Sequence, residues 1–359
     1  MKAYVLHGIS DLRYEKINRP TLQPGQVLVK VQAAGICGSD IPRIYRTGAY
    51  HHPMTPGHEF SGLVVEVGEG VSREWEDKRV GIFPLIPCMG CSACRKQKYE
   101  MCSHYNYLGS RTDGGFAEYV AVPQWNLIEL PIEVTYEQAA MLEPMAVAVH
   151  AIRQSGLMDA EGNPIRGKEK MSIAVCGLGT IGLFIVMLLK SLQYDTVYTM
   201  GNKDSQLYLA EKLGVSKECY CDVRNTETGN WLIKKTQGEG VDVFFECVGK
   251  NEVLTQGIDS VSPGGIVVIV GNPAGDMALE KAVYWKILRR QITIQGTWNS
   301  SFTHNEDDDW HYVLNALKDG KIHPEQMITH RFPLNSLNKG FELMRDKSED
   351  YVKVMGIFS

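Results

Sequence analysis

One stretch near the middle of the chain constrains its fold more than any other: MSIAVCGLGTIGLFIVMLLKSL, which begins at Met171. The β-prone residues IAVC lead directly into Gly177, Gly179 and Gly182 in the pattern GxGxxG, and the apolar run LFIVMLL follows. This order predicts a strand, a tight turn and a helix. In such a unit the first glycine permits the turn, the second lets a pyrophosphate approach the backbone, and the third allows close helix–strand packing. The stretch therefore predicts a dinucleotide site, with the anion at the helix N-terminus.

Strands and helices alternate after this stretch, which is typical of a doubly wound parallel sheet covered by helices. A chain of 359 residues is also long enough for two domains. We therefore expect an α/β fold with a Rossmann domain over residues 150–296. The expected strands are residues 195–200, 241–249, 264–271 and 291–298, and the expected helices are residues 206–214 and 251–261.

The dinucleotide is expected to contact the glycine turn and the end of the second strand. The turn residues expected to touch it are Gly177, Gly179, Thr180, Ile181 and Gly182. An acidic residue usually binds the adenosine ribose about 20 residues after the glycines, but here the strand ends at Gly201, Asn202 and Lys203. Without that carboxylate a 2′-phosphate is not repelled, and Lys203 can pair with it, so we expect NADP rather than NAD. A strand end shifted to Asp204 would favour NAD instead.

Charge and hydropathy exclude several kinds of partner. The net charge of −5 argues against nucleic acid or an anionic membrane. No apolar run approaches the ~20 residues that a bilayer-spanning helix needs. The first residues, MKAYVLHGISDLRYE, lack the apolar core of a signal peptide. We therefore expect a cytoplasmic protein whose thiols stay reduced.

Four of the nine cysteines crowd into one polar segment, CMGCSACRKQKYEMC. Tetrahedral zinc accepts four thiolates, and short C-x2-C steps bring pairs of sulfur atoms onto one ion. Iron–sulfur segments continue with x3-C-P, whereas here seven residues separate the last two cysteines, and free thiols are the remaining alternative. A four-thiolate shell has no open position, so we expect a structural zinc site. Its ligands would be Cys88, Cys91, Cys94 and Cys102.

A second metal position is suggested by the segments GICGSD and TPGHEFSG. A catalytic zinc ion needs three protein ligands and one open coordination position. Cys37 and His58 supply two suitable donors, and the third could come from Glu59 or from Glu143. Each residue alone is weak evidence, because a lone cysteine is usually a small buried apolar residue.

The segments GICGSD, GHEFSG, the four-cysteine segment, DGGFAEY, LEPMAVAVHA and GLGTIG occur in that order. With these segments in this order, the chain resembles the zinc-dependent medium-chain alcohol and polyol dehydrogenases along essentially its whole length. The resemblance implies a β-rich GroES-like catalytic domain over residues 1–149 and 297–359, which includes the structural zinc lobe, with the Rossmann domain between. It also implies homodimers or homotetramers, with an edge strand of the Rossmann sheet often pairing across the interface.

The resemblance also implies the roles of residues at the catalytic metal. Zinc would be held by Cys37, His58 and Glu143, with Glu59 as an outer or exchanging ligand and with Asp40 orienting His58. Each subunit would then hold two zinc ions. The metal would bind the substrate hydroxyl and hydride would pass to the nicotinamide of NAD(P), with Ser39 as the first proton acceptor.

The alcohol-oxidising branch often has a histidine five residues after the ligand cysteine, but Pro42 stands there in this chain. The proton must therefore leave by another route. Within the family the chain looks most like the sugar-alcohol branch, and this resemblance implies a polyol or a polyol phosphate as substrate. Its expected contacts are Arg43, Tyr50, Trp298 and Asn299. Two alternatives are a dehydrogenase of a free polyol or diol (sorbitol, threitol or butanediol type) and a catalytically silent dinucleotide-binding protein.

Overall fold

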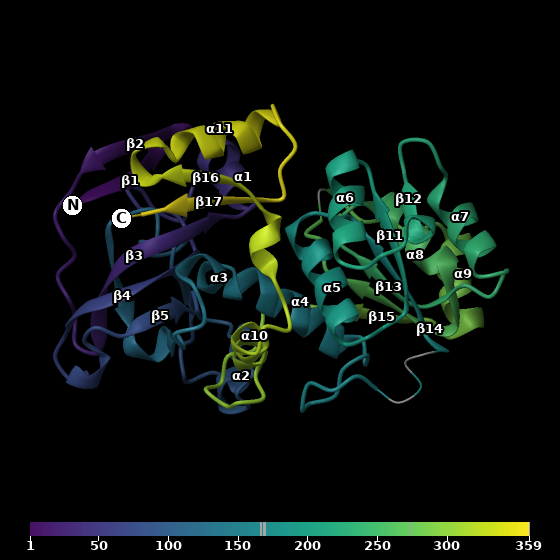
Figure 1. The fold of residues 1–359 in the computed structure, drawn as a ribbon, viewed down its shortest axis with the longest axis horizontal. Coiled ribbons are helices and arrows are strands. Elements are labelled where there is room, and N and C mark those ends of the chain that lie inside the picture. Colours follow the sequence, from purple (N-terminus) through teal and green to yellow (C-terminus); the bar gives the residue numbers. More distant parts are fainter. Residues whose placement is uncertain (166, 168–169, 274, 359) are drawn as a thin grey trace. The chain divides into compact units, whose positions relative to one another are not determined.

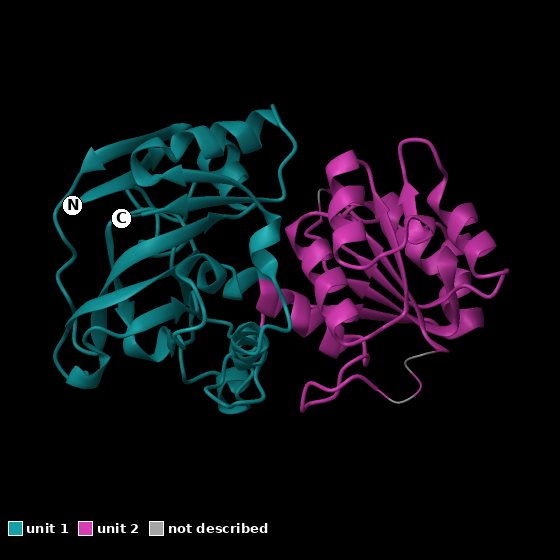
Figure 2. Ribbon diagram, in the orientation of Figure 1, with its two compact units in different colours: residues 1–144, 301–359 teal, residues 145–300 magenta. Residues whose placement is uncertain are grey.

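The computed structural model describes residues 1–165, 167, 170–273 and 275–358. The chain forms two compact units, one made of residues 1–144 with 301–359 and the other of residues 145–300 (Figure 2). The second unit is thus inserted into the first. The predicted boundaries, after residues 149 and 296, lie close to these divisions, the first of which falls inside helix α4 (Leu142–Gln154).

The first unit is built on a seven-stranded sheet in which β3 is the central and longest strand (Figure 1). Strand β3 pairs antiparallel with β4, β8 and β17, and only β16 and β17 run parallel. Strand β17 comes from the segment that follows the inserted unit, so the sheet needs both parts of the chain. The strands are β3 (Gln26–Ile36), β4 (Glu59–Val67), β5 (Arg79–Ile82), β8 (Tyr119–Pro123), β9 (Leu127–Glu129), β16 (Ile328–Pro333) and β17 (Lys353–Ile357).

Two small two-stranded sheets and short helices complete this unit. Helix α11 buries one apolar side, and its Phe341 ring packs edge-on against Tyr4 and Phe116 at centroid distances of 5.6 and 5.1 Å. The two-stranded sheets are β1 (Lys2–Gly8) with β2 (Asp11–Lys16) and β6 (Leu85–Ile86) with β7 (Asn106–Tyr107). The helices are α1 (Asp40–Pro42), α2 (Ser92–Arg95), α3 (Tyr136–Ala140), α10 (Asp309–Lys318) and α11 (Asn338–Asp346).

The second unit contains a six-stranded parallel sheet in the order β12-β11-β10-β13-β14-β15. The strand order reverses between β10 and β13, and ligands of such sheets bind beyond the carboxyl ends of the strands at this point. Strands buried on both faces are apolar throughout, as IAVC in β10 illustrates. The strands are β10 (Ser172–Cys176), β11 (Thr196–Gly201), β12 (Tyr220–Asp222), β13 (Val241–Glu246), β14 (Val261–Ile269) and β15 (Thr293–Gly296).

Helices connect these strands. They are α5 (Thr180–Ser191), α6 (Asp204–Lys212), α7 (Thr228–Lys235), α8 (Asn251–Ser260) and α9 (Lys281–Arg290). Strand β12 and helices α7 and α9 were not among the predicted elements. Strand β12 has only three residues, too few for an alternating or apolar pattern to stand out. Within the described residues, none of the helices has both the length and the apolar character needed to cross a membrane.

Candidate active site

A compact group of side chains that could hold a metal ion lies where strand β3 ends and strand β4 begins. Cys37 follows β3, and His58 and Glu59 stand at the start of β4. The antiparallel register places Gly35 opposite Glu59, which brings these two strand ends together. One donor atom from each of Cys37, His58 and Glu59 lies within 4.8 Å of the other two. Thiolate, imidazole and carboxylate are the donors that zinc takes in catalytic sites.

Asp40 stands behind this group and is fully buried. Its Oδ1 lies 3.4 Å from His58 Nδ1 and accepts a 2.7 Å hydrogen bond from Arg43, while its Oδ2 accepts a 3.0 Å bond from the Cys37 amide. Burial opposes ionisation, but the neighbouring His58 ring, followed by Arg43 and the Cys37 amide, holds the pKa of Asp40 below its usual value. A carboxylate on Nδ1 leaves the other ring nitrogen of His58 for a metal.

Glu59 has an ion-pair partner that is equally buried. Lys353, the first residue of β17, donates from Nζ to Glu59 Oε2, and Nζ also lies 3.3 Å from the Ile36 carbonyl oxygen. The exposed fractions of the two side chains are 1% and 2%. Only glycine fits at position 35, since a Cβ there would lie 2.3 Å from Glu59 Oε2 and 2.6 Å from Lys353 Cε. The sequence analysis missed Lys353, although a lysine within the apolar run of β17 was a usable signal.

Glu143 lies beside the Cys37–His58–Glu59 group rather than within it. It stands in the first turn of α4, and its Oε1 accepts a 3.1 Å hydrogen bond from the Tyr107 hydroxyl. The Tyr107 ring in turn packs edge-on against His58 at a centroid distance of 5.9 Å. Burial raises the pKa of Glu143 to about 7 against the opposing charge of His58. The assignment of Glu143 rather than Glu59 as third ligand therefore stays a prediction.

The proposed proton acceptor and substrate contacts occupy different surroundings. The Ser39 hydroxyl donates to Cys37 Sγ over 3.3 Å, so it stands directly beside the metal-binding group. Arg43 is engaged by Asp40, and the Tyr50 side chain is exposed. Trp298 and Asn299 belong to the other compact unit. The roles of the predicted proton acceptor and of all four predicted substrate contacts stay predictions.

Arg111, which the sequence analysis did not select, has its guanidinium over two aromatic rings. Its guanidinium carbon is 4.3 Å from the centroid of Tyr50 and 4.2 Å from that of Tyr105. Tyr105 packs edge-on against Tyr107, at 6.1 Å, and so connects this arginine to the residues around Glu143. No carboxylate among the described residues forms an ion pair with Arg111.

The four cysteines of the segment 88–102 converge on one point. Their sulfur atoms all lie within 4.8 Å of one another, with separations of 3.5 Å (Cys91 to Cys94), 3.8 Å (Cys91 to Cys102) and 4.0 Å (Cys88 to Cys94). A tetrahedral zinc with Zn–S bonds of about 2.3 Å requires sulfur separations of about 3.8 Å. Backbone amides of Cys94 and Ser103 lower the pKa of Cys91 to about 5, which favours the thiolate form that binds metal. The spacing and chemistry of these donors fit a structural zinc ion.

The glycine turn of the second unit has the geometry that a pyrophosphate requires. Gly177 has a φ of 97°, which favours glycine. A Cβ on Gly182 would lie 2.1 Å from the Gly177 carbonyl oxygen, whereas a Cβ on Gly179 would have no atom within 4 Å. The turn is therefore closed where α5 packs on β10 and open where a ligand would approach. Thr180 and Ile181 begin α5 and direct their amides to the same place.

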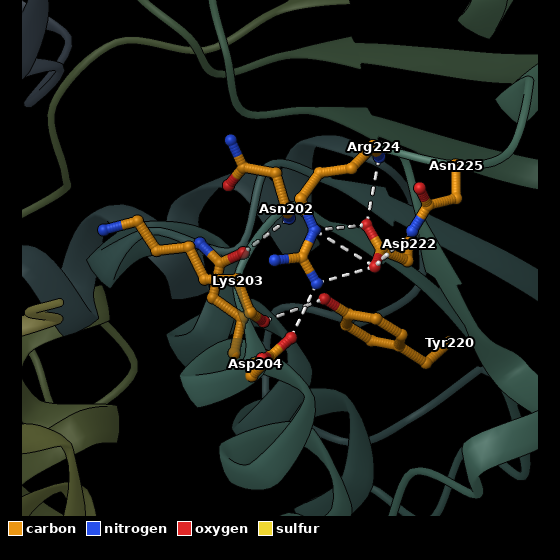
Figure 3. A network of polar contacts seen from close by, with 8 residues as sticks. Asn202, Lys203, Asp204, Tyr220, Asp222, Arg224 and Asn225 are labelled. Carbon is orange, nitrogen blue, oxygen red and sulfur yellow. Dashed lines mark hydrogen bonds and ion pairs between the residues drawn. The ribbon is translucent and has the colours of Figure 1, made fainter.

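The end of β11 has no space for an acidic side chain. A Cβ on Gly201 would lie 2.6 Å from Gln206 Oε1 and 2.8 Å from the Tyr220 hydroxyl oxygen. The Asn202 amide donates to the same Gln206 oxygen over 2.8 Å. Lys203 precedes α6, and its carbonyl accepts a 3.1 Å bond from the Tyr220 hydroxyl (Figure 3). Gln206 and Tyr220 thus fill the position in which a ribose-binding carboxylate would begin.

Each of the two units contains residues that match a known protein family. Residues 23–132 match the family described as alcohol dehydrogenase GroES-like domain, and residues 180–319 match zinc-binding dehydrogenase. The chain is similar to galactitol 1-phosphate 5-dehydrogenase of Escherichia coli K12, with 30% identity over 306 residues, 85% of each chain. It is also similar to (R,R)-butanediol dehydrogenase of Bacillus subtilis 168, with 33% identity over 370 residues, 99% of each chain.

Solved structures agree with this result. The crystal structure of galactitol-1-phosphate dehydrogenase from Escherichia coli has a TM-score of 0.89 and 29% identity, and the match covers 99% of this chain and 100% of that chain. The predicted fold class, a GroES-like β-rich domain plus a Rossmann domain, is confirmed by these matches.

Proposed function

Because the chain belongs to the zinc-dependent medium-chain alcohol and polyol dehydrogenases, we propose that it moves hydride between a polyol phosphate of the galactitol 1-phosphate type and NADP. At the level of its family, the chain is an oxidoreductase that acts on a CH–OH group with NAD(P). The observation that carries the proposal is the convergence of Cys37, His58 and Glu59 in front of the buried Asp40.

Two sets of residues would hold zinc, one ion each. Cys37 and His58 with Glu143 would hold the catalytic ion, and the four cysteines of the segment 88–102 the structural one. A bound catalytic zinc supplies Lewis acidity, which lowers the pKa of an alcohol hydroxyl. Glu143 is favoured over Glu59 as third ligand because Lys353 already pairs with Glu59, whereas the Glu143 carboxylate accepts its hydrogen bond from the uncharged Tyr107 hydroxyl and forms no ion pair among the described residues.

Several residues of the chain would orient the metal-binding group around the substrate hydroxyl and receive the proton of that hydroxyl. Asp40 fixes the orientation of His58, and the ion pair between Glu59 and Lys353 ties the start of β4 to β17. Ser39 accepts the substrate proton, since its hydroxyl stands beside Cys37 and can both accept and donate.

A phosphate on the substrate needs a cation that is not already paired. Arg43 is committed to Asp40, whereas Arg111 lies over two aromatic rings, donates to the uncharged Tyr105 carbonyl and Tyr50 hydroxyl, and has no carboxylate partner among the described residues. Arginine forks suit phosphate oxygens, so we assign the phosphate to Arg111 in place of Arg43. Tyr50, whose ring stacks on Arg111, would line the same place.

Turnover of galactitol 1-phosphate compared with free galactitol tests the substrate. We expect a higher kcat/KM for the phosphorylated polyol, and we expect R111Q to lower it by roughly 10-fold to 100-fold while sparing the free polyol. R345Q is the matched control, because Arg345 also stacks on a tyrosine of the same unit, Tyr45. A higher kcat/KM for the free polyol or a diol would refute the phosphate assignment in favour of the second candidate, which the similarity to butanediol dehydrogenase supports.

The variant C37S tests whether the chain is an enzyme at all. We expect it to lose at least about 100-fold in kcat/KM while its affinity for NADP, measured by titration, is unchanged. Unchanged turnover would refute the metal assignment, and an inactive wild type would favour the catalytically silent alternative.

The exposed edge of the Rossmann sheet suggests how subunits associate. Strand β15 is one of the two edge strands, and the preceding helix α9 exposes Tyr284, Trp285 and Leu288. An unpaired strand edge and exposed apolar side chains each favour contact with a second copy. We propose a cytoplasmic homodimer joined at β15, with a homotetramer as the alternative. Light scattering of the purified protein distinguishes the dimer, the tetramer and a monomer, which would contradict both.

A further inference from the structure

A polar network lies beside Gly201, where strands β11 and β12 both end (Figure 3). The parallel register places Asp222, the last residue of β12, next to Gly201. Arg224 follows two residues later and bonds to this carboxylate with two nitrogens on one edge of its guanidinium: Nε to Oδ1 over 2.9 Å and Nη2 to Oδ2 over 2.7 Å. Nη2 also donates to Asp204 Oδ1 over 2.6 Å. The fork of Arg224 is therefore fixed at the carboxyl edge of the sheet.

One nitrogen of this guanidinium remains available. Nη1 donates to none of the protein groups that the structure describes. In Figure 3 it points away from Asp222, toward the side on which Lys203 is drawn. The two partners of Arg224 also differ, because the exposed fraction of the Asp222 side chain is 26% and that of Asp204 is 89%. Asp222 therefore holds the arginine in place, whereas the solvated Asp204 is easily displaced.

From this geometry we propose that Arg224 binds the 2′-phosphate of NADP. In this assignment Asp222 is a positioning residue, and Asp204 is a competing anion that the phosphate displaces from Nη2. The proposal rests on the proposed function, from which it takes the dinucleotide, but it assigns the selectivity to a residue beyond the Gly201–Lys203 segment.

Arg224 is better placed for this role than Lys203. The Lys203 side chain extends away from the guanidinium in Figure 3. Arginine also matches phosphate with a fixed, planar fork, and here the fork is already oriented, so little conformational freedom is lost on binding. Asp222 stays ionised under all ordinary conditions, since its bonds from Arg224 lower its pKa to about 2.

The competing interpretation is that Asp222 or Asp204 binds the ribose hydroxyls of NAD. Arg224 already engages both oxygens of Asp222, and Asp204 is the more exposed acid. The two interpretations make opposite predictions for a nucleotide fragment with and without the 2′-phosphate.

Calorimetric titration of the full-length, zinc-loaded protein with adenosine 2′,5′-bisphosphate and with 5′-AMP tests the assignment without any turnover. We expect the wild type to prefer the bisphosphate. R224A should lose roughly 10-fold to 100-fold in affinity for the bisphosphate and keep its affinity for 5′-AMP, and R224K should lose less because it retains the charge. K203A is the matched control and should change the preference less than R224A. D204N should raise the affinity for the bisphosphate by about 2-fold to 5-fold.

The outcomes separate the assignment from the function on which it rests. If the wild type binds both nucleotides equally, the NADP preference and the Arg224 assignment are both refuted. Polyol turnover with NAD would in that case still support the dehydrogenase activity. If the wild type prefers the bisphosphate and R224A retains that preference, only the Arg224 assignment is overturned. Because Arg224 is half-exposed, all variants should fold, which circular dichroism verifies.

Discussion

The two units of this chain both place charged networks at strand ends, but one is buried and the other is solvated. In the first unit the exposed fractions of Lys353 and Glu59 are 1% and 2%. In the second unit those of Arg224 and Asp204 are 47% and 89%. A buried ion pair cannot lose one partner without leaving an uncompensated charge, whereas an exposed pair exchanges partners at little cost. The first arrangement suits a fixed metal site, and the second suits a site that must admit a phosphate.

The largest expected effect comes from breaking the buried pair. K353M should destabilise the protein by about 3–5 kcal/mol, because the Glu59 carboxylate stays buried without its counter-charge. Urea unfolding measures this, with K78M as the matched control, since Lys78 pairs with Glu129 at the surface of the same unit. The double variant K353M/E59Q should recover much of the loss. Equal midpoints for K353M and K78M would refute the distinction between buried and exposed pairs.

The next effect concerns the metal rather than the fold. D40N should lower zinc affinity by about 10-fold to 100-fold, as loss of the carboxylate behind a metal-binding histidine does. Competition with a chromophoric chelator measures the affinity, and D346N, which changes an exposed aspartate of the same unit, should leave it unchanged. Normal zinc retention by D40N would show that His58 does not need Asp40 for its orientation.

The exposed network should contribute little to stability. R224A should change the free energy of unfolding by less than about 1 kcal/mol, although it removes the bonds to Asp222 and Asp204. The small loss should shrink further in high salt, which screens exposed charges. A loss as large as that of K353M would place Arg224 among the structural residues instead.

The smallest effect is a pH dependence in the second unit. Burial raises the pKa of Glu246, whose Oε1 accepts 2.8 Å bonds from the Val248 and Gly249 amides. The folded state then binds more protons than the unfolded state above the ordinary glutamate pKa of about 4.5, so this group makes stability fall as pH rises from there. E246Q keeps the acceptor oxygen and should flatten that part of the profile. Identical profiles of unfolding free energy against pH for E246Q and wild type would contradict this.

Local patterns were sufficient to predict much of the fold. The GxGxxG turn, its strand and its helix all lie within residues 171–192, so their signals depend on neighbours in the sequence. The cysteines of the segment 88–102 are likewise close in sequence. Strand β12 was missed because three residues are too few to show a pattern. Arg224 was missed for the same reason, since its position beside Gly201 follows only from the register between β11 and β12.

The parts of the site that escaped prediction depend on contacts between distant residues. Lys353 meets Glu59 across 294 positions, and nothing near either residue indicates the other. Arg111 stands out as a candidate phosphate ligand only when the structure shows its guanidinium over the rings of Tyr50 and Tyr105. The choice between Glu59 and Glu143 as zinc ligand also depends on Lys353, which the sequence pattern does not bring near either carboxylate.

The insertion of the second unit into the first has a consequence for biosynthesis. Strand β17 pairs with β3, yet all of residues 145–300 are translated between them. While a ribosome is still making the inserted unit, the nascent sheet lacks its last two strands, β16 and β17, and Glu59 does not yet have Lys353 to neutralise it. The dinucleotide unit, whose strands all come from one continuous segment, can therefore mature first, and the metal-binding unit is finished only afterwards.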